Sequence, residues 1–171
     1  MKSNGKIVEA YCNYSPPVHV YGSVQLLLRF IPPEHHVGVH QIVLSNSEEV
    51  RTQIKGKIPL GKIRVRPAEC RGLYAEGKIV LLMDRIFGSY PEIFFLIPQF
   101  KTYVIGRTLY HEIGHHIHRL EQPGYRNDEE AVADRWREKL LRQFLVQRYW
   151  YLAKPLRVIS AAINTVTLKR R

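Results

Sequence analysis

The segment from Gln99 to Leu120 constrains the fold of this chain most strongly, because its residue pattern predicts a long two-sided helix. One side carries His111, Glu112 and His115, which fit within an arc of about 100° around the helix axis. The opposite side carries the apolar residues Leu109, Ile113, Ile117 and Leu120. We therefore expect the apolar side to pack against a sheet and the three polar groups to face one cleft.

The polar side of this predicted helix forms an HExxH motif, His111-Glu112-Ile113-Gly114-His115. Histidines four residues apart project from the same helical stripe, so their two imidazoles can bind one Zn²⁺. The competing interpretation is a helix with surface histidines and a glutamate that pairs with a neighbouring base. Catalytic zinc usually has three protein ligands and keeps a fourth position for water, so the metal hypothesis requires a third ligand.

The best candidate for the third ligand is Glu130. No histidine follows His118, so a ligand further along the chain has to be a carboxylate. Glu130 lies near the start of a second predicted helix, Asp128 to Ala153, one turn before Asp134. A loop from 121 to 126 is long enough to reverse the chain and bring Glu130 toward the two imidazoles. Asp134 is then placed to accept the outer N–H of a ligating histidine.

Glu130 also fits a purely structural role. Asn127 followed by Glu130 matches a helix N-cap with a capping-box glutamate, and acidic residues favour the first turn of any helix. The metal interpretation is favoured because it explains Glu130 and the HExxH motif together. Two further histidines are assigned other roles: His116 to packing or the surface, and His118 to the cleft lining, since it lies too far along the axis to bind the same ion.

The HExxH motif followed by Glu130-Ala131-Val132-Ala133-Asp134, an ExxAD pattern, resembles the gluzincin metallopeptidases. The short span between the motifs is most similar to minigluzincins and to the peptidase domain of ImmA and IrrE type regulators. The resemblance implies zinc ligands His111, His115 and Glu130, a general base and acid at Glu112, and an orienting Asp134. The motif match covers 111 to 134, and a weaker likeness in element order extends over about 41 to 145.

The chain departs from the related metzincin pattern, which would require Gly at the position of His118 and His or Asp at the position of Glu121. Gluzincins commonly use a Tyr or His to stabilise the oxyanion, and the motif does not identify that residue here. The candidates for it are Tyr125, Tyr149, Tyr151 and His118.

Strand-like segments precede the helices, which predicts an α+β fold with a small twisted mixed sheet. The predicted strands are Lys6 to Cys12, Val39 to Leu44, Ile63 to Val65 and Lys78 to Met83. The segment from Val18 to Ile31 fits a helix or a long apolar strand. Lys78 to Met83 fits either the rim strand that binds an extended peptide or a plain core strand. We expect one zincin-like domain over residues 1–171, with a basic end, about 155–171, whose placement stays open.

Charge and composition limit the partners. The net charge is +11, and the stretch from Arg135 to Arg171 has ten basic residues against one acidic residue. Such a surface is either simply solvated or suited to bind nucleic acid, and anionic lipid is a less favoured partner. The sequence contains no helix-turn-helix pattern that would support nucleic-acid binding. Cys12 and Cys70 are too few and too distant for a cysteine zinc site, although a single disulfide stays open. Without a signal-like N-terminus or a membrane-length apolar run, we expect a cytoplasmic location.

These observations predict a zinc-dependent metallopeptidase that acts on peptide or protein substrates. The alternative is a regulatory or binding protein with a structural or vestigial zinc site and a basic surface for nucleic acid. An intermediate hypothesis is a latent peptidase whose own terminal segment occupies the cleft.

Overall fold

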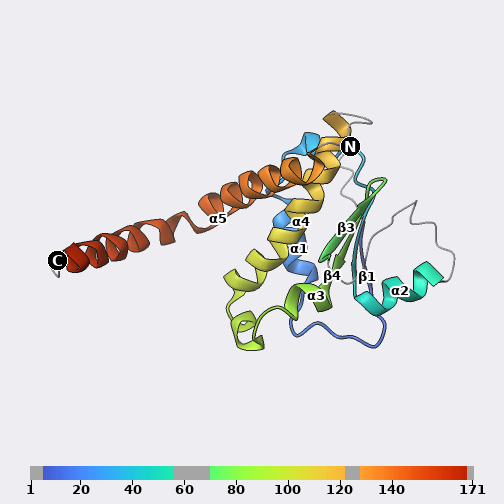
Figure 1. Cartoon of the computed structure of the whole chain (residues 1–171), viewed down its shortest axis with the longest axis horizontal. Helices are drawn as coiled ribbons and strands as arrows, with labels where there is room; N and C mark the ends of the chain where they lie inside the picture. The colour runs from blue at the N-terminus through green and yellow to red at the C-terminus, as the bar shows by residue number, and fades with distance from the viewer. Residues whose placement is uncertain (1–5, 56–69, 122–127, 169–171) are drawn as a thin grey trace.

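A computed structural model describes residues 6–55, 70–121 and 128–168 of the chain. The fold class is α+β, as predicted: a four-stranded mixed sheet is followed by two long helices that pack on each other (Figure 1). In chain order the elements are β1 (Lys6–Ala10), α1 (Tyr21–Leu28), the 3-10 helix η1 (Pro33–His36), β2 (Gln41–Ser45), α2 (Ser47–Lys55), β3 (Gly72–Ala75), β4 (Lys78–Leu82), α3 (Met83–Phe87), the 3-10 helix η2 (Glu92–Leu96), α4 (Pro98–Glu121) and α5 (Glu129–Leu168).

The sheet has the strand order β1-β2-β4-β3. Strands β1, β2 and β4 run parallel, and β3 pairs antiparallel with β4 through a tight turn at Glu76 and Gly77. Both turn residues have positive φ, which matches the geometry of short hairpin turns. Within the described residues, β3 is therefore the outer strand on the side that faces α4.

Alternating side chains give the sheet two apolar faces. Ile42, Leu44, Ile79 and Leu81 join the main core with α1, α4 and α5. Val43, Leu73, Val80 and Leu82 form a smaller cluster with Val50 of α2 on the other face. This separation follows from the two-residue period of a strand. Figure 1 shows the same arrangement, with α4 and α5 on one side of the sheet and α2 on the other.

Most of the predicted elements are confirmed by the structure. The segments that begin at Lys6 and Lys78 contain β1 and β4, the segment from Val39 to Leu44 covers β2 except for its last residue, and the segment from Val18 to Ile31 contains the helix α1. The long helices predicted at Gln99 to Leu120 and Asp128 to Ala153 are α4 and α5. Residues 156–168 are helical and continue α5, while the strand predicted from Ile63 to Val65 lies outside the described residues.

Some details differ from the prediction. Met83 begins the short helix α3 instead of ending the strand, and neither β3 nor α2 was predicted. Leu120 does not extend the buried apolar side of α4: it is 49 % exposed, because α4 ends one residue later and extends past the core at this point. Leu109, Ile113 and Ile117 are buried as expected.

Helix α5 is kinked at Tyr149, where the backbone leaves helical geometry. After the kink it leads away from the sheet and α4 (Figure 1). No helix in the described part of the chain combines the length and the apolar character needed to cross a membrane.

Helices α4 and α5 are in close contact at Gly114. A Cβ atom at this position would lie only 2.6 Å from the Cα atom of Ala133 on α5, so the two backbones are in direct contact. About two turns earlier on α4, a Cβ atom at Gly106 would lie 3.5 Å from a methyl group of Leu141. Moving back along α4 thus corresponds to moving forward along α5, and the helices pack antiparallel.

We predict that Gly114→Ala destabilises the protein by about 1–3 kcal/mol, because the added methyl group meets backbone that has to move. Gly106→Ala is the matched control. Its Cβ would meet only the side-chain methyl groups of Leu27 and Leu141, so the gain in helix propensity, up to about 1 kcal/mol, should offset the crowding. Urea unfolding of both variants provides the test, and equal effects at the two glycines would contradict the assigned contact.

Candidate metal centre

Two histidines and one glutamate meet where α5 begins beside α4. His111 and His115 project from α4, and Glu130 projects from the first turn of α5. The Nε2 atoms of the two histidines are 3.2 Å apart. The Glu130 carboxylate places Oε2 3.3 Å from His111 Nε2 and Oε1 3.5 Å from His115 Nε2. The structure thus brings together the three ligands predicted from the sequence, as a group able to hold a metal ion.

The spacing of these atoms suits a tetrahedral ion. Zinc binds imidazole nitrogen and carboxylate oxygen at about 2.0–2.2 Å, so ligand atoms around a tetrahedral zinc are separated by about 3.3–3.5 Å. The observed separations of 3.2, 3.3 and 3.5 Å fall close to that range. Two imidazoles and one carboxylate are also ligand types that zinc accepts. The residues present therefore fit a zinc ion.

The outer nitrogen of His111 is held by Asp134, as predicted. His111 Nδ1 donates a hydrogen bond to Asp134 Oδ1 over 2.9 Å, which leaves Nε2 free to face the other two ligands. Arg137, one turn further along α5, donates to the same Asp134 oxygen over 2.8 Å. This carboxylate between an imidazole and a guanidinium fixes the ring orientation that metal binding requires. Arg137 was not predicted from the sequence.

The Nδ1 atom of His115, on the side of the ring away from the ligand group, lies near a different carboxylate, which was not predicted from the sequence. This atom is buried and lies 3.4 Å from Glu129 Oε1, close enough for electrostatic attraction but without hydrogen-bond geometry. Arg119 donates to the same Glu129 oxygen over 3.2 Å. Burial, followed by the neighbouring His111, lowers the pKa of His115 and favours the neutral imidazole that binds metals. The only sequence signal for Glu129 was a second acidic residue beside Glu130.

Glu112 of α4 is buried beside the ligand group, and its side chain packs against the start of β3. A Cβ atom at Gly72 would lie 2.6 Å from Glu112 Oε1, so the carboxyl group packs directly against the backbone of this strand. Burial, with a smaller contribution from the charge of Glu130, raises the pKa of Glu112 to about 8. A carboxyl group with such a pKa exchanges protons readily near neutral pH.

The strand next to Glu112 is β3, and this corrects one of the two interpretations of residues 78 to 83. Strand β4 lies between β2 and β3, with pairing on both sides, so Lys78 to Met83 contains a core strand and no free rim. Among the described strands, β3 is the outer strand at this edge of the sheet, and we call it the rim strand. Its four residues, Gly-Leu-Tyr-Ala, gave too short a pattern for a strand to be predicted.

His116 has a packing role, in agreement with one of its two predicted roles. It is buried, and its Nε2 donates to the carbonyl oxygen of Val37 over 2.8 Å. Its Nδ1 accepts a hydrogen bond from the Tyr74 hydroxyl over 2.8 Å. That hydroxyl in turn accepts the backbone N–H of Gly77. His116 therefore links α4 to the β3–β4 hairpin and takes no part in the ligand group.

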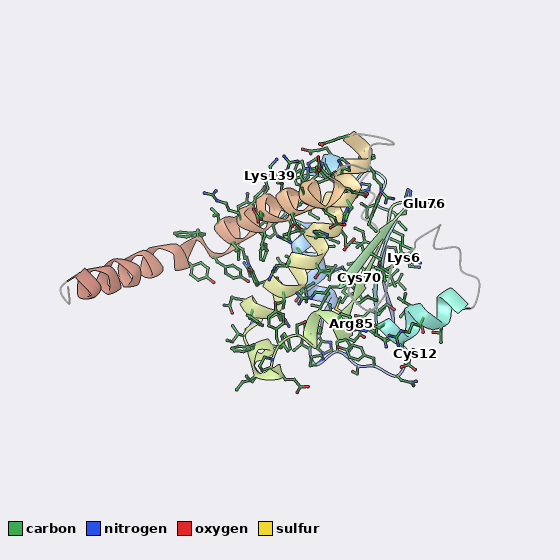
Figure 2. All side chains as sticks on the ribbon, viewed as in Figure 1. Lys6, Cys12, Cys70, Glu76, Arg85 and Lys139 are labelled. Carbon is green, nitrogen blue, oxygen red and sulfur yellow. The ribbon has the colours of Figure 1, made fainter. Side chains whose placement is uncertain are left out.

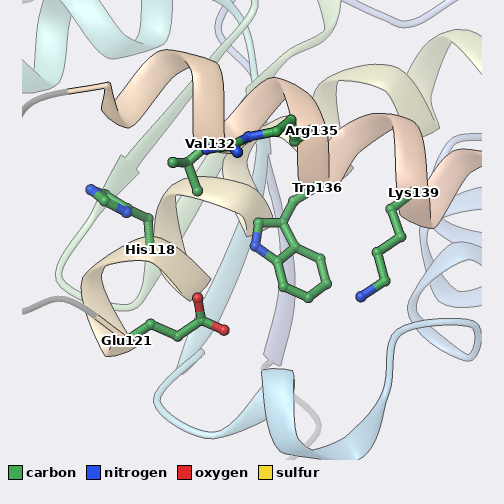
Figure 3. A pocket seen from close by; sticks show the side chains of 6 residues that line it. All are labelled: His118, Glu121, Val132, Arg135, Trp136 and Lys139. Carbon is green, nitrogen blue, oxygen red and sulfur yellow. The ribbon is translucent and has the colours of Figure 1, made fainter.

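His118 lines a pocket of about 320 Å³ at the end of α4, together with Glu121 and four residues of α5 (Figure 3). The α5 residues that complete the lining are Val132, Arg135, Trp136 and Lys139. Lys139 Nζ lies 4.0 Å from the centre of the Trp136 ring. None of the three metal-ligand candidates lines this pocket, so His118 lies in a cavity beside the metal centre and outside the ligand group.

The remaining histidines and cysteines have ordinary contacts. His35 packs edge-on against Trp136, with ring centres 4.8 Å apart, and His36 Nε2 lies 3.1 Å from the carbonyl oxygen of Ile31. Cys12 and Cys70 form no disulfide (Figure 2). Within residues 6–55, 70–121 and 128–168, the group of His111, His115 and Glu130 is the one arrangement of potential ligands close enough to hold an ion.

Comparisons with protein families, with curated proteins and with solved structures found no match to this chain.

We predict that Glu112 makes the metal-free protein less stable as the pH rises. Its folded-state pKa lies above its unfolded value, so its contribution to stability is complete at acidic pH and is lost between about pH 5 and pH 8. Glu112→Gln cannot ionise and should keep more of its thermal stability across this range. Thermal melts of both chelator-treated proteins at several pH values provide the test. Identical pH profiles would show that burial does not disfavour the ionised form of Glu112 in the folded state.

Proposed function

We propose that this protein is a zinc-dependent metallopeptidase that hydrolyses peptide bonds with Glu112 as general base and acid. The observation that carries the proposal is the convergence of His111, His115 and Glu130 at tetrahedral ligand spacing, with a buried glutamate next to them. The resemblance to gluzincins over the HExxH and ExxAD motifs assigns the same residues to the same roles.

A zinc ion held by His111, His115 and Glu130 would act as a Lewis acid on the substrate carbonyl and would make water a stronger acid. The protein residues supply the remaining chemistry. Asp134 holds the His111 ring in place through its hydrogen bond to Nδ1. In its ionised form, Glu112 accepts the proton of the attacking water, and it then donates that proton to the leaving amine.

The rim strand β3 provides a means of holding the substrate. An extended peptide can add to a sheet by pairing with an outer strand, which positions its carbonyl groups at regular intervals. Gly72 at the start of β3 packs against Glu112, so a peptide paired with this strand would pass close to the carboxyl group. The lack of a side chain at Gly72 is essential here, because a Cβ atom would occupy the space of the Glu112 carboxylate.

Two of the oxyanion candidates are too far away to serve. Tyr149 and Tyr151 lie more than five helical turns beyond Glu130, or roughly 28 Å along the α5 axis. Tyr125 lies outside the described residues, and His118 lines the neighbouring pocket. Neither tyrosine of α5 therefore enters the proposed mechanism.

The alternative function, a regulatory or binding protein with a structural zinc site, is less well supported. A structural zinc site is normally closed by four protein ligands, whereas the group in the described residues offers three. The side chain of Glu130 is 80 % exposed, so the centre is reached from solvent on the α5 side. Both features favour a site that exchanges substrate. The single zincin-like domain, cytoplasmic location, nucleic-acid contact and latency remain predictions.

We predict that Glu112→Gln binds zinc with unchanged stoichiometry and loses at least about 100-fold in kcat on an unstructured protein substrate, because only the proton carrier is removed. Glu121→Gln, an exposed change near the end of the same helix, is the matched control and should retain activity. Elemental analysis combined with a fluorogenic casein assay measures both properties. Full activity in Glu112→Gln would rule out the proposed mechanism, and a zinc-free wild-type protein would remove its basis.

We further predict that Asp134→Ala weakens zinc binding by about 10- to 100-fold, because His111 loses the group that orients its ring. Glu138→Ala serves as the control, since Glu138 also contacts Arg137 but lies away from the histidines. Competition with a zinc chelator measures both affinities. Equal affinities in the two variants would mean that Asp134 does not support the site.

A further inference from the structure

The segment around η2 exposes an unusual amount of apolar surface. Ile93, Phe94, Leu96 and Ile97 lie within five consecutive residues and are between 43 % and 78 % exposed. Isolated exposed apolar side chains are common, but a continuous group of large ones usually marks an interaction surface. Phe94 packs on Phe100 at the start of α4, with ring centres 5.2 Å apart, so the group is attached to the body of the fold.

A second exposed apolar group lies on α5. Val146, Trp150 and Tyr151 are between 50 % and 62 % exposed. The antiparallel packing of α4 and α5 indicates where this group lies relative to η2. Gly114 faces Ala133 and Gly106 faces Leu141, so the same register places the start of α4 level with residue 149. Figure 1 shows η2 and the kink of α5 on the side of the molecule away from α2.

These two groups, which we call the apolar end, lie far from the metal centre. The η2 group adjoins the start of α4, about 20 Å along that helix from His111, and the α5 group begins about 24 Å along α5 from Glu130. Thirteen residues of α4 separate Pro98 from His111, and each residue adds about 1.5 Å along the axis. A partner bound at the apolar end would leave the metal centre accessible to solvent.

The balance of acidic and basic residues also changes along the helix pair, from the metal centre toward the apolar end. Apart from Glu92, the first residue of η2, no acidic residue lies between Pro91 and His111, and none follows Glu138. Residues 140–171 contain seven basic residues. The acidic residues of α4 and α5 all lie toward the other end of the helix pair. Glu112, Glu129, Glu130 and Asp134 are at the metal centre, and Glu121 and Glu138 lie further from it. The apolar end therefore lies in the basic part of the helix pair.

We propose that the apolar end docks onto the surface of an anionic lipid bilayer and holds the protein there with its metal centre facing the aqueous phase. Exposed aliphatic side chains enter the boundary between headgroups and acyl chains, and nearby basic residues are attracted to anionic headgroups. Trp and Tyr favour this interface because each combines an apolar ring with a polar group. The proposal does not depend on peptidase activity.

The sequence beyond the kink has the composition of such a surface helix. Residues 156–168 contain one charged residue, Arg157, and apolar residues recur at helical spacing in Leu156, Ile159, Ile163 and Val166. The backbone is helical to Leu168, and the next three residues in the sequence are Lys169, Arg170 and Arg171. An apolar periodicity with basic flanks is typical of helices that lie in a membrane interface.

Lipid accounts for these features better than two other partners. Nucleic-acid surfaces select basic and aromatic groups, and they do not explain exposed Ile93, Leu96 and Ile97. A symmetric dimer through the apolar end would bring the basic stretches of two copies together, with no acidic residues in those stretches to balance them.

The test is flotation of the full chain with vesicles of phosphatidylcholine alone or mixed with phosphatidylserine. We expect binding to the anionic vesicles to be at least about tenfold stronger, and to weaken at high salt. The double variant Leu96→Ser with Ile97→Ser, and Trp150→Ser, should each lose most of this binding. Val37→Ser replaces an equally exposed apolar residue outside the apolar end and is the control.

Fold integrity is checked by the thermal midpoint and zinc content of each variant. In a Trp136→Phe background, Trp150 is the remaining tryptophan, so its fluorescence should shift to the blue on anionic vesicles. Absent or charge-independent vesicle binding would overturn the proposal, as would Leu96 and Ile97 variants that bind like wild type. Tighter binding to an oligonucleotide than to anionic vesicles, or a dimer that these variants dissociate, would assign the surface to another partner.

Discussion

The close approach of α4 and α5 at Gly114 and Ala133 is the contact on which the metal centre depends. Gly114 lies between His111 and His115, and Ala133 lies one turn after Glu130. Because a methyl group at Gly114 would collide with the α5 backbone, the separation of the helices is set by the smallest residues available. At this separation the Glu130 carboxylate reaches both imidazoles, with Oε2 3.3 Å from His111 Nε2 and Oε1 3.5 Å from His115 Nε2. The two motifs therefore encode the helix packing as well as the ligands.

The centre concentrates negative charge that the protein balances only in part. Glu112, Glu129, Glu130 and Asp134 surround two histidines, while Arg119 and Arg137 pair with the outer carboxylates of Glu129 and Asp134. Among the residues that the structure describes, no such arginine contact is found for Glu130, whose carboxylate faces the histidines. The repulsion contributes to the raised pKa of Glu112. A divalent cation placed among these groups would relieve the imbalance, which gives a physical reason why this cluster is suited to a metal.

The parts of the site that could be predicted from the sequence are those set by local periodicity. The spacing of His111, His115, Glu130 and Asp134 places each on a known helical face, and a short connection brings the two helices together. The contacts that depend on tertiary packing were not predictable. Gly72 approaches Glu112 only because β3 turns back at the edge of the sheet, and Glu129 meets His115 because α5 starts at a particular rotation. Strand β3 was missed because four residues carry little alternation, and Leu120 was misassigned because helical phase does not show where the core ends.

The hairpin that carries the rim strand is anchored at its turn. The carbonyl oxygen of Gly77 accepts the backbone N–H of His40, and a Cβ atom at Gly77 would collide with the Gly38 carbonyl oxygen, so position 77 has no room for a side chain. The Tyr74–His116–Val37 hydrogen bonds join the same corner to α4. Lengthening this turn by even one residue would break several of these bonds at once. Descendants of this chain that acquire a longer or differently shaped substrate groove would therefore be expected to gain their insertions elsewhere and to keep this corner at constant length.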